Sequence, residues 1–121
     1  MENTAKINTW NLMIGDWVMD GTEPAQVTSI TCDGIVETTR NERSNIEQLS
    51  PIPLTQEILE SNGIMMEFRN IDDDTSIHRK VRSVYDNWEI QRFGWKMVEV
   101  RYVHELQNVL NICGIRREIT L

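Results

Sequence analysis

The chain has few of the features that define small secreted, zinc-binding or membrane proteins. Its only two cysteines, Cys32 and Cys113, lie far apart without a C-x-x-C pair, and with only two histidines they make a poor zinc set. Uninterrupted apolar runs are only a few residues long, so we expect no membrane-spanning segment. No apolar segment follows Met1, so we expect no secretory signal and reduced cysteines in a cytosol. The sequence therefore favours a cytoplasmic protein without metal, cofactor or membrane contact.

Positive charge is also scarce. Lys and Arg number 12 against 19 Asp and Glu, which gives a net charge of −7 at pH 7. This balance argues against non-specific binding to nucleic acid or to an anionic membrane. A hydrophobic content of 40% and four tryptophans suit a globular core. At 121 residues, we expect a single domain spanning residues 1–121.

Catalytic motifs are absent. The sequence contains no G-x-S-x-G, P-loop, H-E-x-x-H or G-x-G-x-x-G pattern. The consecutive Asp72, Asp73 and Asp74 lack the spacing of a calcium loop and predict a turn. These absences favour a non-enzymatic protein. An enzyme stays a weaker alternative, because active sites are assembled in space and not along the sequence.

The first half of the chain predicts a β-meander followed by a short helix. Residues 10–40 indicate three antiparallel strands, which resemble the opening of small SH3-like barrels. Residues 40–50 are polar and predict a loop. Residues 54–62 predict a two-turn helix, with Thr55 as its N-cap and the Asn62-Gly63 pair at its end.

The second half predicts more strands and a longer helix. Residues 64–100 indicate antiparallel strands, which we place at 65–68, 77–85, 88–93 and 95–100. Residues 101–113 predict a helix that ends at Gly114, and residues 115–121 either add an edge strand or pack as a tail. Strands, short helix, strands and longer helix in this order predict an α+β fold with antiparallel sheets.

The predicted terminal helix has two distinct faces. Its apolar face consists of Tyr102, Val103, Leu106, Val109, Leu110 and Cys113. Its other face consists of His104, Gln107, Asn108 and Asn111. The second face is rich in amides and nearly free of charge, so it can donate and accept hydrogen bonds in fixed geometry. We take its four residues as candidate ligand-binding residues. The alternative is that they hydrogen-bond neighbouring backbone and fix the helix to a sheet.

A second candidate site is the basic run around residue 80. In an extended strand, His78, Lys80 and Arg82 point the same way, and Arg92 would join them from the following strand. Such a cluster can hold a phosphate. The alternatives are a solvated strand face or cations paired with the three aspartates at 72–74. Tryptophans are core residues by default, and we take Trp88 as the candidate to stack on a base.

Three segments together resemble a family of small proteins encoded by phages and prophages of gut anaerobic bacteria. They are LMIGDWV at 12–18, PIPLTQEILESNGI at 51–64 and YVHELQNVLNICG at 102–114. The match spans most of the chain, and the last two motifs are specific. One departure is Ile64, where the family usually has an aromatic residue. The resemblance implies a phage or prophage context and assigns no role to any residue.

These observations lead to one preferred function and two alternatives. Phages use small proteins to defeat host defences, so the resemblance implies an anti-defence protein in the host cytosol that sequesters a nucleotide-derived signalling molecule. Basic, aromatic and amide side chains suit the phosphates, base and ribose of such a ligand. The first alternative is a protein–protein interaction module, which inhibits a host protein or serves as a virion accessory. The second is an enzyme that degrades a signalling nucleotide. A homo-oligomer stays open.

Overall fold

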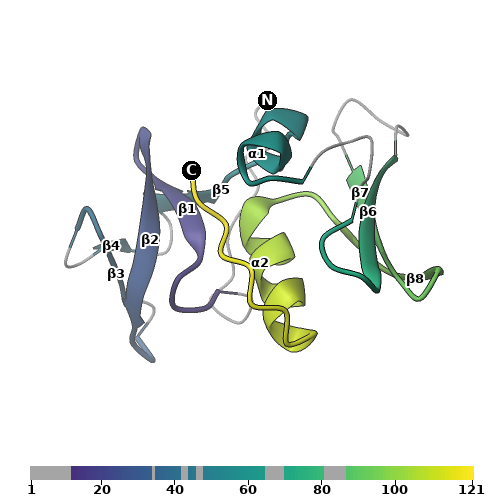
Figure 1. Cartoon of the computed structure of the whole chain (residues 1–121). Helices are drawn as coiled ribbons and strands as arrows, with labels where there is room; N and C mark the ends of the chain where they lie inside the picture. Colours follow the sequence, from purple (N-terminus) through teal and green to yellow (C-terminus); the bar gives the residue numbers. More distant parts are fainter. Residues whose placement is uncertain (1–11, 34, 42–43, 46–47, 65–69, 81–86) are drawn as a thin grey trace.

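The computed structural model describes residues 12–33, 35–41, 44–45, 48–64, 70–80 and 87–121. Within them, two antiparallel sheets lie on either side of a central helix, α2 (Val103–Ile112), and a short helix, α1 (Gln56–Ser61), lies near its start (Figure 1). This arrangement confirms the predicted α+β fold. No helix among the described residues is long and apolar enough to cross a membrane.

The first sheet is the predicted meander with two further strands. Its elements are β1 (Trp17–Asp20), β2 (Glu23–Ile30), β3 (Ile35–Thr38), β4 (Ser44–Asn45) and β5 (Leu49–Pro51). The strand order is β4-β3-β2-β1-β5, with every neighbouring pair antiparallel. A small core of Leu12, Val18, Val27, Val36 and Leu49 lies within this sheet.

The expectation of a loop over residues 40–50 is wrong. β4 pairs with β3, where Val36 lies opposite Ser44, and β5 pairs with β1, where Asp20 lies opposite Leu49. Strands of two or three residues are too short to show an alternating pattern. They form here because a longer strand offers its free edge, which is a tertiary effect that a local pattern does not carry.

Helix α1 begins and ends as its sequence predicts. The Thr55 hydroxyl accepts a hydrogen bond from the Ile58 N–H at 3.3 Å, which satisfies one of the free donors of the first turn. Asn62 is the C-cap, and Gly63 follows with φ +81°, a left-handed conformation that favours glycine. Leu59 is the buried residue of this helix.

The second sheet has three strands in sequence order. They are β6 (Thr75–Lys80), β7 (Asn87–Arg92) and β8 (Trp95–Val100). The strands predicted at 88–93 and 95–100 are confirmed, and β6 covers the first part of the strand predicted at 77–85. Residues 65–68 and 81–85 lie outside the described part of the chain.

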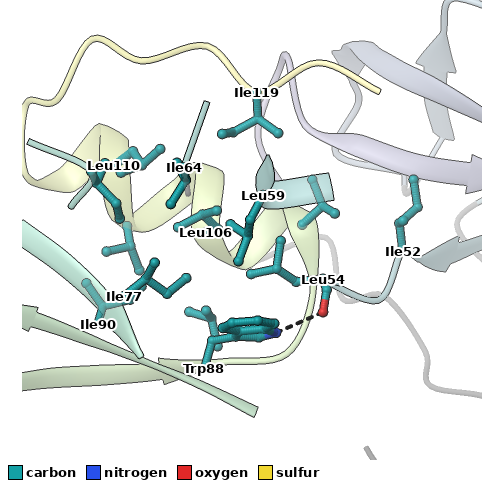
Figure 2. Packing of buried hydrophobic residues seen from close by; sticks show 14 residues of the cluster. Ile52, Leu54, Leu59, Ile64, Ile77, Trp88, Ile90, Leu106, Leu110 and Ile119 are labelled. Atoms are coloured by element: carbon teal, nitrogen blue, oxygen red, sulfur yellow. Dashed lines mark hydrogen bonds between the residues drawn. The ribbon is translucent and has the colours of Figure 1, made fainter. Parts of the chain in front are cut away.

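The main core joins the second sheet to both helices (Figure 2). Its most deeply buried members include Leu54, Leu59, Ile64, Ile77, Trp88, Ile90, Leu106 and Leu110.

The C-terminal segment after Gly114 forms no strand. It packs as a tail between α2 and β1, where Ile119 is buried and its carbonyl accepts the Trp17 Nε1–H at 2.7 Å. Of the two predicted arrangements for residues 115–121, the packed tail is confirmed.

Candidate functional site

Gln107 fixes helix α2 to the turn before β1. Its Oε1 accepts a hydrogen bond from the Trp17 N–H at 2.8 Å, and its Nε2 donates to the Gly15 carbonyl at 3.0 Å. The same carbonyl accepts the Gln26 Nε2–H at 3.1 Å. Gly15 has φ +95°, so the turn requires a residue that tolerates this conformation. Both polar ends of the Gln107 amide are therefore used in the fold.

Asn108 acts on the same turn through Asp16. Asp16 is only 1% exposed. One of its carboxylate oxygens accepts the Met13 N–H at 2.8 Å, and the Asn108 side chain also hydrogen-bonds to the Asp16 carboxylate. Burial raises the pKa of Asp16 to about 7, although both hydrogen bonds oppose this shift. Asp16 is thus a buried carboxyl that titrates near neutrality and connects α2 to the first sheet.

His104 is buried within the fold, with 5% of its surface exposed. Its ring stacks on Tyr102 with centroids 6.0 Å apart, and its Nδ1 has no hydrogen-bond partner among the described residues. Burial lowers the pKa of His104, and the Glu105 carboxylate opposes this only partly. His104 is therefore neutral at pH 7 and does not offer a cation to a ligand.

Asn111 is the exposed member of this helix face, and it lines two adjoining cavities. The first, here called the turn cavity, has a volume of about 370 Å³. It is lined by Ile14, Gly15, Asp16, Gln26, Gln107, Asn111, Arg117, Glu118, Ile119 and Thr120. It lies where the turn before β1, α2 and the tail meet.

The second, the tail cavity, has a volume of about 550 Å³. It is lined by Asn111, Gly114, Ile115, Arg116, Arg117 and Glu118. Arg117 donates a hydrogen bond from Nη1 to the Asn62 carbonyl at 3.1 Å, which holds the guanidinium beside both cavities. Asn62 also holds the tail directly, because its Oδ1 accepts the Thr120 N–H at 2.8 Å.

The basic run around residue 80, predicted as a phosphate site, lies on strand β6 and not at the two cavities. His78 is half-buried on β6, where its Nε2 is 2.8 Å from the Ser76 hydroxyl and its cross-strand neighbour is Glu89. Lys80 is the last residue of β6 and lies opposite Asn87. Arg82 lies outside the described residues, so its place in a phosphate cluster stays a prediction.

Arg92 does not join His78 and Lys80, and this part of the prediction is wrong. The register places Arg92 opposite Thr75, at the other end of β6 from Lys80. Because side chains alternate along a strand, Arg92 also lies on the face opposite to His78. It lies near Asp72, where its charge contributes to the lowered pKa of that carboxyl after the dominant hydrogen bond from the Asp74 N–H.

Trp88 belongs to the core. It has no exposed surface, and its indole N–H donates to the Leu54 carbonyl at 2.8 Å (Figure 2). Its ring therefore offers no surface on which a ligand base can stack.

The second sheet and the two cavities lie on different sides of α2. Strand β7 packs on the apolar side of α2, whereas Gln107 contacts the turn before β1. The structure consequently brings no described residue of the basic run into the two cavities.

Several cavity residues were not among the sequence candidates. Arg116 and Arg117 are adjacent in the sequence and follow the helix end at Gly114, which is a visible signal. Gln26 has no such signal, because only the packing of β2 against the turn brings it there.

No family model, curated protein or solved structure matches the chain.

Proposed function

We propose that the chain is a non-enzymatic binding protein that captures a small nucleotide-like ligand in the adjoining turn and tail cavities. The observation that carries the proposal is that Asn111, Arg117 and Glu118 line both cavities. One elongated ligand can therefore contact both at once. Each volume lies in the range of about 300–1,000 Å³ that is usual for small-molecule sites.

The two cavities suit different parts of such a ligand. Arg116 and Arg117 can hold phosphate oxygens with paired N–H groups in the tail cavity. The amides of Asn111 and Gln26 can bond to the polar edge of a base in the turn cavity. In this proposal, residues of the tail bind the anionic part of the ligand, and Arg92 does not.

The phage resemblance supports the biological setting of the proposal. In that setting the ligand is a nucleotide-derived signalling molecule of host immunity, and the protein withholds it without altering it. The enzyme alternative differs in one measurable respect, because it predicts a product of changed mass.

Calorimetry against a panel of cyclic mononucleotides, cyclic dinucleotides and ADP-ribose derivatives tests this function. We expect at least one compound to bind and to be recovered unchanged, by mass spectrometry, after the protein is denatured. Arg116→Ala removes an exposed guanidinium from the tail cavity. Since a charge-assisted contact contributes about 1.5–3 kcal/mol, binding should weaken about tenfold or more.

The matched control is Arg101→Ala, because Arg101 is exposed and lines neither cavity. It should bind as the unaltered protein does. Absence of binding across the whole panel would exclude the proposed function. Equal losses in the two arginine variants would exclude the proposed site, and a product of altered mass would favour the enzyme.

A further inference from the structure

Asp16 is a buried carboxyl group in the wall of the turn cavity, and hydrogen bonds of the backbone fix its position. Its N–H donates to the Met13 carbonyl at 3.1 Å, and its carbonyl accepts the Val27 N–H at 2.9 Å. The Gln107 side chain also bonds to the backbone of both neighbouring residues. The carboxyl group therefore cannot swing into solvent without breaking the contact between the turn and α2.

No cation compensates the charge of Asp16 within the described part of the chain. The tail brings two charged side chains, Arg117 and Glu118, to the same cavity. Arg117 donates from Nη1 to the Asn62 carbonyl, and none of the described ion pairs includes Asp16. Burial therefore raises the pKa of Asp16 to about 7, although two hydrogen bonds oppose the shift. The charged and neutral forms of this carboxyl are thus about equally populated at pH 7.

The other elements packed around this carboxyl present uncharged groups. β2 contributes Gln26 to the cavity, and α2 contributes Gln107 and Asn111. α2 also carries His104, which is buried, and this burial lowers its pKa from 6.5. His104 is therefore neutral over the range above pH 6.5, in which Asp16 loses its proton.

We propose that the turn cavity takes up a proton together with its ligand: Asp16 is protonated when an anionic nucleotide fills the two cavities, so capture weakens as pH rises above neutrality. This role rests on the proposed function and regulates the same site. A ligand in the turn cavity displaces water from the wall that Asp16 forms, which penalises the charged carboxylate further. Phosphates held by Arg116 and Arg117 add negative charge in the adjoining tail cavity. Both effects favour the protonated carboxyl in the complex.

The linkage between proton and ligand sets the size of the effect. The free protein loses the Asp16 proton as pH rises through about 7, whereas the complex retains it to higher pH. Binding above neutrality therefore includes the cost of protonating Asp16. The dissociation constant should rise about five- to twentyfold between pH 6.5 and pH 8.5.

Calorimetry at these two pH values, with ADP-ribose, a cyclic mononucleotide and a cyclic dinucleotide, tests the proposal. These probes carry no terminal phosphate monoester, so their own charge does not change over this range. Asp16→Asn removes the titrating group and keeps an oxygen for the Met13 N–H, so its affinity should be the same at both pH values. The matched control is Glu118→Gln, which removes the other carboxylate of the turn cavity and should keep the pH dependence.

A second measurement uses the unaltered protein alone. At pH 7.5, the binding enthalpies in two buffers of different ionisation enthalpy give the number of protons taken up, which should be about half a proton or more per ligand. Binding without proton uptake, or a pH dependence that persists in Asp16→Asn, would overturn the proposal and leave the proposed function intact. Binding of no probe at either pH would overturn the proposed function, and this role with it.

Discussion

At the residue scale, most of the uncharged polar face of α2 serves the fold. Gln107 has both amide ends bonded to backbone of the turn before β1, and Asn108 bonds to the buried Asp16. Buried polar groups need such partners, because an unpaired one costs about 1–3 kcal/mol. Asn111 is different because it is exposed and lines both cavities. The sequence shows that this face is rich in amides, but it does not separate these roles, since the roles depend on contacts with residues about ninety positions away.

Asp16 gives the fold a pH dependence that one substitution should remove. Its folded pKa of about 7 exceeds the ordinary value of 3.8, so the folded chain holds a proton that the unfolded chain has released. The stability from this proton is fully present below pH 3.8 and is lost as pH rises through about 7. Asp16→Asn should therefore be more stable than the unaltered chain at pH 8, by about 1–3 kcal/mol, and this advantage should be clearly smaller at pH 5 and vanish below pH 3.8.

Urea denaturation of both proteins at the two pH values measures this difference. Asparagine retains an oxygen that can accept the Met13 N–H, so the turn should persist. An equal stability difference at pH 5 and pH 8 would mean that the Asp16 carboxyl does not titrate as its burial requires.

At the element scale, local signals predicted the helices well and the shortest strands poorly. The cap at Thr55, the glycines at 63 and 114, and the spacing of Leu106 and Leu110 are local features, and the structure follows them. β4 and β5 depend on pairing with strands distant in the sequence. The register of β6 and β7 likewise separates Arg92 from His78, although a count along the two strands had joined them.

Helix α2 should lose most stability when the centre of its apolar face is truncated. Leu106 has no exposed surface and packs in the main core. Leu106→Ala should therefore cost about 2–5 kcal/mol in the free energy of unfolding, which denaturant titration measures. The matched control is Ile112→Ala on the same helix, since Ile112 is 80% exposed and should change stability by less than about 0.5 kcal/mol. Equal costs at the two positions would contradict the assigned faces.

At the scale of the whole molecule, α2 lies between the two sheets, and the tail packs between α2 and β1. The predicted α+β class follows from the order of elements. The two cavities were not predictable, because they form only where the turn before β1, α2 and the tail come together. Trp17 and Asn62 hold the tail in that place through residues 119 and 120. The proposed site therefore depends on packing between segments from both ends of the chain.

The most direct test of the account is an amide-resolved NMR titration of the isotope-labelled protein with ADP-ribose, a cyclic mononucleotide and a cyclic dinucleotide. If the cavities bind one of these ligands, the shift changes should concentrate at Asn111, at residues 114–118 and at the Gly15 turn, and they should saturate. Changes concentrated on β6 around His78, or no saturable change with any of the three compounds, would contradict the account.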